Sequence, residues 1–201
     1  MPRVRPYYAV KANPDTEIIQ TLQRLGAGFD CASAHEIDLA LGAGADSNED
    51  IIFANCCKFP GDLTFSHHQG VKRMTFDSVD ELHKIKAISP DAEVVLRIVT
   101  DDSESTCQLS NKFGASLCDV DQLLDTVNEL GLDCIGTSFH VGSGGTDVNA
   151  YAEPLEHAAW VFEQAKAKGI DMTLLDIGGG FPGDDSGAVT FEQIAKEVNS
   201  P

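Results

Sequence analysis

Lys11 follows a short apolar run, Tyr7 to Val10, near the start of the chain. A lysine at the end of a buried strand holds its charge partly out of water, and desolvation together with neighbouring cations favours the neutral amine. The neutral amine attacks carbonyl groups, so this position suits a Schiff-base lysine. The competing interpretation is a structural lysine whose long stem carries the charge out to solvent.

A glycine-rich run, Asp176 to Gly183 (DIGGGFPG), follows another apolar segment. Consecutive glycines allow backbone N–H groups to approach a phosphate without interference from Cβ atoms. Gly178, Gly180 and Gly183 also satisfy the G-x-G-x-x-G pattern of dinucleotide sites. Such a site needs a helix to begin within the motif, and Pro182 with the polar residues after it prevents that. The run is therefore interpreted as an anion-binding loop, with a tight structural turn as the alternative.

A second loop of small residues, Gly142 to Thr146 (GSGGT), comes directly after His140 and Val141. The hydroxyl of Ser143 can donate to a phosphate oxygen. His140 can stack on a flat ring or transfer a proton, and alone it would be read as a hydrogen-bonded core histidine. Two glycine-rich loops after neighbouring strands are typical of barrel phosphate sites, so together they predict a phosphorylated ligand.

Three further charged residues accompany these motifs. Asp30 stands in an apolar setting that requires a cationic or hydrogen-bonding partner, for which Lys11 is the candidate. Arg97 interrupts a β-branched strand and can direct its planar fork of donors to a phenolate or carboxylate. Glu36 supplies another carboxylate nearby. Structural ion pairing remains the alternative for Glu36 and Arg97.

Short apolar runs that could form buried strands recur along the chain. The expected strands are Tyr7–Val10, Gly28–Ala32, Ile51–Ala54, Arg73–Phe76, Val94–Val99, Cys134–Val141 and Thr173–Ile177. Amphipathic helical patterns lie between them, and the first five begin about 22 residues apart, the length of a strand, a helix and two loops. This rhythm predicts a parallel sheet, either an open doubly wound sheet or a (β/α) barrel short of its eighth strand. Both architectures place chemistry at the carboxyl ends of the strands.

Composition excludes several classes of function. The chain has 201 residues and a net charge of −18, so we expect one soluble unit that binds neither nucleic acid nor anionic membranes. Cationic small molecules remain compatible with this charge. The six cysteines lack disulfide or zinc-site spacing, so reduced buried thiols and no metal are expected. Without a signal peptide or apolar span, the expected location is cytoplasmic.

Four motifs, in order and separation, closely resemble the eukaryotic ornithine decarboxylases. They are YAVK at 8–11 with Asn13, GFDCAS at 28–33 with Glu36, FHVGSG at 139–144, and DIGGGFPG at 176–183, and the resemblance extends along essentially the whole chain. It implies pyridoxal 5′-phosphate as cofactor and decarboxylation of L-ornithine to putrescine in polyamine biosynthesis. It also implies a head-to-tail homodimer and an alanine-racemase-like (β/α)8 TIM-type barrel followed by a β-domain.

The resemblance assigns roles residue by residue. Lys11 matches the Schiff-base lysine, Asp30 and Glu36 the active-site carboxylates, and Arg97 the arginine near the cofactor ring. His140 matches the histidine stacked on that ring. The phosphate-binding groups are matched by Ser143, Gly178, Gly179 and Gly180. The cofactor-binding set is thus Lys11, Asp30, Arg97, His140, Ser143 and these three glycines, and the catalytic set is Lys11, Asp30, Glu36 and His140.

On this resemblance, residues 1–201 are expected to form a partial cofactor-binding barrel domain that ends before the last barrel strand and the β-domain. The family's glutamate for the pyridine nitrogen, a phosphate-binding arginine and a Cys-Asp pair from the partner subunit have no counterpart here, so the chain alone is expected to have little activity. Rival assignments are a related barrel decarboxylase for diaminopimelate, lysine or arginine, a non-catalytic homologue that binds antizyme, and a cofactor carrier without turnover.

Overall fold

Strands and helices alternate along the chain in the computed structural model, which describes residues 1–103, 105–144, 147–184, 187 and 189–199. The strands are β1 (Tyr7–Ala9), β2 (Gly28–Cys31), β3 (Ile51–Phe53), β4 (Arg73–Phe76), β5 (Glu93–Arg97), β6 (Asp133–Ser138) and β7 (Leu174–Asp176). The α-helices are α1 (Thr16–Arg24), α2 (Ala34–Gly42), α3 (Pro60–His68), α4 (Val79–Ile88), α5 (Val120–Leu130), α6 (Ala152–Ala167) and α7 (Phe191–Val198). Short 3-10 helices are η1 (Val10–Ala12), η2 (Leu117–Asp119) and η3 (Val148–Tyr151).

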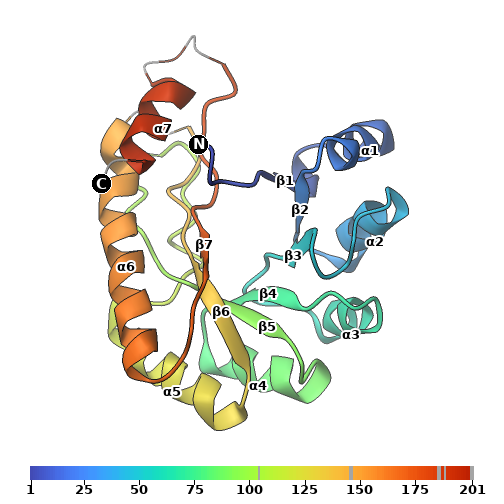
Figure 1. Cartoon of the computed structure of the whole chain (residues 1–201), viewed down its shortest axis with the longest axis vertical. Helices are drawn as coiled ribbons and strands as arrows, with labels where there is room; N and C mark the ends of the chain where they lie inside the picture. Colours follow the sequence, from blue (N-terminus) through green and yellow to red (C-terminus); the bar gives the residue numbers. More distant parts are fainter. Residues whose placement is uncertain (104, 145–146, 185–186, 188, 200–201) are drawn as a thin grey trace.

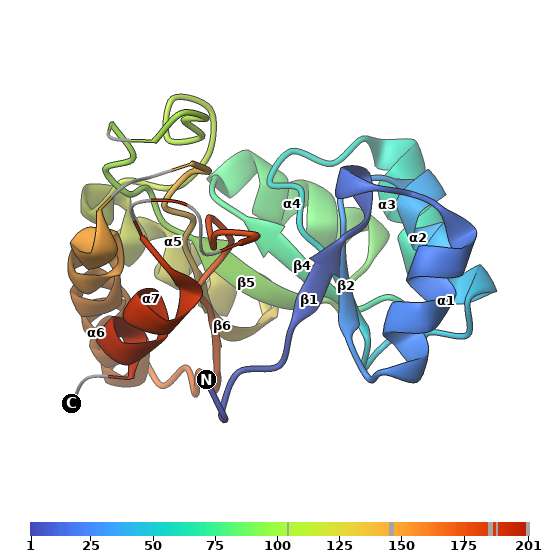
Figure 2. The same cartoon turned by 90° about the horizontal axis from the view of Figure 1, so that it is seen from above.

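The seven strands form one parallel sheet in the order β1-β2-β3-β4-β5-β6-β7. Each strand pairs with its neighbour in the sequence, whereas a doubly wound sheet reverses its strand order at a switch point. The sheet curls, and the helices lie on its outer side (Figures 1 and 2). The expected barrel architecture is therefore confirmed, and the doubly wound alternative is excluded.

Local sequence fixes where the helices begin. The side chains of Asp15, Ser33 and Ser78 accept hydrogen bonds from the first turns of α1, α2 and α4. Thr190 and Gln193 form a reciprocal capping box at the start of α7. These contacts satisfy backbone N–H groups that have no partner within the helix. Because α7 begins only at Phe191, no helix opens within the glycine run that ends at Gly183, as the sequence analysis predicted.

The two faces of the sheet differ in chemistry. In β2, Phe29 and Cys31 are fully buried in the main core, whereas Asp30 between them is half-buried. In β5, Val94 and Leu96 belong to that core and alternate with Glu93 and Arg97. Successive strand residues point to opposite faces, so the polar members of β2 and β5 face the inside of the curl.

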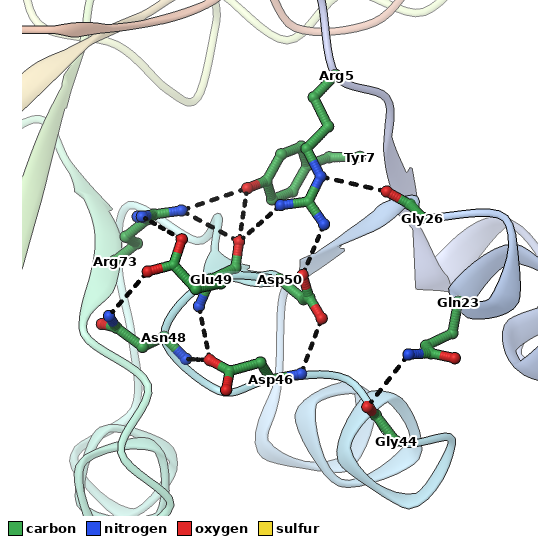
Figure 3. Close-up of polar contacts among 10 residues, drawn as sticks. All are labelled: Arg5, Tyr7, Gln23, Gly26, Gly44, Asp46, Asn48, Glu49, Asp50 and Arg73. Carbon is green, nitrogen blue, oxygen red and sulfur yellow. Dashed lines mark hydrogen bonds and ion pairs between the residues drawn. The ribbon is translucent and has the colours of Figure 1, made fainter.

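A polar network occupies the amino-terminal end of the sheet (Figure 3). The guanidinium of Arg5 lies 2.6 Å from an Asp50 carboxylate oxygen and donates to the carbonyl of Glu49. Arg73, which begins β4, and the hydroxyl of Tyr7 donate to the same carbonyl. These contacts tie together the segments that enter β1, β3 and β4 and so stabilise this end of the sheet.

Several details differ from the expectations. Most strands are shorter than the apolar runs, because runs such as Cys134–Val141 continue past β6 into the rim of the barrel. All six thiols are free, but only Cys31, Cys56 and Cys134 are buried, while Cys57, Cys107 and Cys118 are exposed in loops or on a helical turn. None of the helices in the described ranges is both long and apolar enough to span a membrane.

Candidate active site

The carboxyl ends of the strands bring the predicted polar residues to one rim. Arg97 and Asp176 are the last residues of β5 and β7, and Asp30 lies one residue before the end of β2. Lys11 follows β1 in η1, and His140 follows β6. The curl of the sheet brings the rim ends of its first and last strands close enough for their charges to interact. The charge of Lys11 helps to lower the pKa of His140, and the charge of Asp30 helps to raise the pKa of Asp176.

Lys11 and Asp30 form an ion pair across the first two strands. The Lys11 Nζ lies 3.5 Å from an Asp30 carboxylate oxygen. The Lys11 side chain is 59% exposed, because β1 ends at Ala9 and the lysine stands on the turn above it. It is thus more open to solvent than the sequence suggested. Burial raises the pKa of Asp30, and the neighbouring Lys11 charge opposes that shift.

His140 is half-buried and lies against the glycine run that follows β7. Its Nδ1 accepts a 3.0 Å hydrogen bond from the backbone N–H of Gly142. A Cβ on Gly179 would stand 3.0 Å from its Nε2, so the ring edge adjoins the 178–180 loop. Burial, followed by the charges of Arg97 and Lys11, lowers the pKa of His140 to about 4. The imidazole is therefore neutral at physiological pH.

Arg97, Ser138 and Asp176 occupy one row across β5, β6 and β7, since they are register partners. Burial raises the pKa of Asp176, and its carboxylate accepts a 2.8 Å bond from the N–H of Gly178. The Ser138 hydroxyl is buried and has no hydrogen-bond partner in the described structure. A buried unpaired hydroxyl beside two charged groups marks a polar position that the sequence analysis missed. The available signal was its position two residues before His140 in the expected strand Cys134–Val141, because alternate residues of a strand share a face.

The two glycine loops pack against each other. A Cβ on Gly178 would overlap the carbonyl oxygen of Phe139, and one on Gly180 would overlap that of Gly142. Ser143 is exposed and pairs through its backbone with Cys107. Gly145 and Thr146 of the second loop lie outside the described residues. The close approach of the loops requires glycine, which fits a phosphate-binding cradle.

Glu36 lies apart from the other predicted carboxylate. Its Oε2 accepts a 2.8 Å hydrogen bond from the backbone N–H of Ala32, between β2 and α2. Among the described residues, no hydrogen bond or ion pair joins Glu36 to Lys11, Asp30 or His140. This contact fixes the chain immediately after β2, the strand that carries Asp30.

A cavity of about 170 Å³ lies beside the glycine loops and is lined by Gly142, Tyr151 and Gly180. Asp101, Asp102, Asp147 and Glu153 also line it, and this acidic wall is unsuited to phosphate. None of Lys11, Asp30, Arg97 and His140 contributes to it. The cavity therefore adjoins the glycine loops at Gly142 and Gly180 but does not reach these four residues. In the described part of the chain, no group of three or more His, Cys, Asp or Glu residues is placed to hold a metal ion.

Comparison with known proteins identifies relatives that match the whole of this chain. The family model described as "Pyridoxal-dependent decarboxylase, pyridoxal binding domain" matches residues 1–201. Ornithine decarboxylase of Neurospora crassa is 51% identical over 200 residues, covering 100% of this chain and 40% of the relative. Antizyme inhibitor 2 of Xenopus laevis is 48% identical over 199 residues, covering 99% of this chain and 43% of the relative. The chain thus spans less than half the length of these relatives.

A solved structure agrees with the sequence relatives. The arginine decarboxylase of Paramecium bursaria Chlorella virus superposes with a TM-score of 0.92 at 39% identity, covering 98% of this chain and 54% of that one. The match to a pyridoxal-binding domain confirms the expected cofactor, and the rim residues described above are chemically suited to it. Residues 1–201 belong to the pyridoxal-dependent decarboxylase family and correspond to its pyridoxal-binding domain.

Proposed function

We propose that the intact protein decarboxylates L-ornithine to putrescine with pyridoxal phosphate, and that Lys11 attaches the cofactor covalently. The observation that carries this proposal is the convergence of Lys11, Asp30, Arg97 and His140 at one rim beside two glycine loops. An amine, a neutral flat ring, a fixed guanidinium and a phosphate cradle are the groups that this cofactor requires. Identity of 51% to an ornithine decarboxylase supports the choice of reaction.

Each residue has a task in this proposal. Lys11 supplies the amine, and Asp30 compensates its charge from 3.5 Å. His140 would supply a flat, neutral ring against which the cofactor ring can pack, and Arg97 would supply a guanidinium for an anionic oxygen of the cofactor. Ser143 and the backbone of Gly178, Gly179 and Gly180 hold the phosphate. When bound, pyridoxal phosphate supplies an electron-accepting ring for the electron pair left by the departing carboxylate.

Glu36 and Ser138 act around this centre. The Glu36 carboxylate anchors the backbone at Ala32, and we infer that it keeps the end of β2, with Asp30, in place. The buried hydroxyl of Ser138 stands in the row of Arg97 and Asp176. A hydroxyl without a partner in that row can receive or donate a hydrogen bond once a polar ligand is present.

We further infer that residues 1–201 form one partial barrel domain of a longer cytoplasmic protein that acts as a homodimer. Ornithine is proposed over lysine and arginine because ornithine decarboxylases recur among the relatives at 45–51% identity, whereas the arginine decarboxylase structure is 39% identical. A non-catalytic role with antizyme as partner is the second candidate, favoured by 48% identity to an antizyme inhibitor. The presence of Lys11, His140 and Ser143 together supports the enzyme.

The test is carbon dioxide release from ornithine, lysine and arginine by the intact protein. We expect ornithine to have the highest kcat/KM, and faster release from lysine would overturn the substrate assignment. Borohydride reduction should fix the cofactor on the peptide that contains Lys11, as seen by mass spectrometry. Lys11→Ala should abolish this adduct, whereas Lys166→Ala on the exposed face of α6 should retain it. An adduct that survives Lys11→Ala would sink the assignment of the lysine.

A further inference from the structure

The polar segment between β5 and η2 lies along the loop that contains His140. The hydroxyl of Thr100 donates a 2.8 Å hydrogen bond to the carbonyl oxygen of His140. The hydroxyl of Ser105 donates a 2.6 Å bond to the carbonyl oxygen of Val141. Both residues therefore hold consecutive backbone carbonyls, those of His140 and of the residue after it, from a segment more than thirty positions earlier in the sequence.

The same segment follows the loop further. Cys107 and Ser143 exchange two backbone hydrogen bonds, of 3.0 and 3.2 Å. The hydroxyl of Thr106 donates to the carbonyl of Gly144 at 3.2 Å. Asp102, which is buried, accepts bonds from the N–H groups of Leu109 and Ser110 and thereby folds the segment back on itself. The His140–Gly144 loop is thus held along its length by side chains and backbone of one other segment.

The conformation of the His140–Gly144 loop determines which nitrogen of His140 carries a proton. The backbone N–H of Gly142 points at Nδ1 from 3.0 Å, and an N–H group can only donate. The Nδ1 must therefore present its lone pair, and a neutral imidazole then has its proton on Nε2. Gly142 reaches this position with a φ of +79°, and a Cβ there would lie 2.5 Å from that of Ser105.

We propose that Thr100 and Ser105 are positioning residues that fix His140 as the neutral tautomer protonated on Nε2, by holding the backbone that presents the Gly142 N–H to Nδ1. Two neighbouring cations, Arg97 and Lys11, favour the neutral ring as well, and with burial they lower the pKa of His140 to about 4. The electrostatic setting and the hydrogen bond thus act in the same direction.

The fixed tautomer gives the ring a defined polarity. Nε2 lies beside Gly179, so its proton is a hydrogen-bond donor on the side of the 178–180 loop. The opposite edge of the ring is occupied by the Gly142 N–H. The ring cannot flip about its Cβ–Cγ bond without breaking the hydrogen bond from the Gly142 N–H to Nδ1. The consequence for turnover rests on the proposed function, whereas the tautomer itself is a property of this chain.

The test uses the intact protein labelled with ¹⁵N-histidine, with and without bound pyridoxal phosphate. The ¹⁵N spectrum of the sedimented protein at pH 7 distinguishes protonated from unprotonated ring nitrogens, and subtraction of the His140→Asn spectrum assigns the signals. We expect His140 to show an unprotonated Nδ1 and a protonated Nε2 already without cofactor. A cationic ring, or a proton on Nδ1, would overturn the proposal whether or not the enzyme decarboxylates ornithine.

Variants connect the tautomer to the two hydroxyls. Thr100→Val keeps the shape of the side chain and removes its donor, while Thr100→Ser keeps the donor. We expect Thr100→Val combined with Ser105→Ala to show both tautomers and a kcat lowered roughly tenfold, by analogy with the residues that orient metal-bound histidines, with KM little changed. Thr100→Ser alone should match the wild-type spectrum and kcat. An unchanged spectrum in the folded double variant would refute the positioning role, and circular dichroism verifies the fold.

Discussion

The hydroxyl of Tyr151 donates a 2.8 Å hydrogen bond to the carbonyl oxygen of Gly179. Tyr151 belongs to η3, is fully buried, and stacks on Phe181 with 5.3 Å between ring centroids. Burial raises the pKa of its phenol above the usual range, so the hydroxyl keeps its proton. The middle glycine of the proposed phosphate loop is thus held from beneath by a tyrosine that the sequence analysis did not identify.

Tyr151→Phe should destabilise the protein by about 1 kcal/mol, the net contribution of one hydrogen bond, and weaken cofactor retention. The loss follows because the Gly179 carbonyl loses its donor while the aromatic stack remains. Urea unfolding and equilibrium dialysis with pyridoxal phosphate measure the two effects. Tyr7→Phe is the matched control, since Tyr7 donates to the Glu49 carbonyl at the opposite end of the sheet. The Tyr7→Phe variant should lose stability but retain the cofactor. Equal cofactor loss in both variants would contradict the prediction.

Gly180→Ala should be strongly destabilising. Gly180 has a φ of +95°, and its added Cβ would overlap the carbonyl oxygen of Gly142. Backbone strain alone accounts for roughly 1–3 kcal/mol, and the overlap forces the two loops apart. Thermal unfolding of the variant quantifies the loss. Gly183→Ala, where a Cβ meets nothing within 4 Å, is the control and should change stability little. Comparable losses at both positions would show that the loops are not tightly packed.

His140 should contribute a distinctive pH dependence. Its pKa in the folded protein is lowered from 6.5 to about 4, so the unfolded chain binds the proton more readily. The associated stability is present above pH 6.5 and is lost as the pH falls through 4. Its size is on the order of 2 kcal/mol after allowance for partial exposure. Unfolding free energies between pH 7 and 4 should therefore fall less steeply in His140→Gln than in the wild type.

Thiol reactivity should divide the cysteines into two equal groups. Cys57, Cys107 and Cys118 are exposed, whereas Cys31, Cys56 and Cys134 are buried. Burial raises the pKa of Cys56 and Cys134 to about 12, so these thiols stay protonated. Iodoacetamide should modify three thiols in the native protein and all six in guanidinium chloride, as mapped by peptide mass spectrometry. The adjacent Cys56 and Cys57 form an internal control, and native labelling of Cys56 would contradict the described core.

The alternation of strands and helices along the chain and the rim of the site could be predicted because they depend on local patterns. Alternating apolar runs and helical spacing determine the β-α units, and Asp30, Arg97 and Asp176 disrupt apolar strands close to their carboxyl ends. Periodicity could not decide between a barrel and a doubly wound sheet, since both share the same units. Only the pairing of each strand with its sequence neighbour resolves that question.

The parts of the site that sequence reasoning missed depend on contacts between distant segments. Tyr151 donates to the carbonyl of Gly179, and Ser105 donates to the carbonyl just before the other glycine loop. Neither residue stands in a motif. Glu36 carries the right charge, but its carboxylate is engaged by the backbone of Ala32. The exposure of Lys11 follows from where β1 ends, and strand ends are the least certain feature of a sequence pattern.

The sequential strand order has a consequence for synthesis of the protein. Since each strand pairs with the one before it, the sheet can grow as a ribosome delivers the chain. Lys11, just after β1, emerges early, while the glycine loop after β7 emerges much later. Under the proposed function, a nascent chain carries the amine that attaches the cofactor long before it carries the loops that bind the phosphate. Tight retention of the cofactor would then be a late event in synthesis.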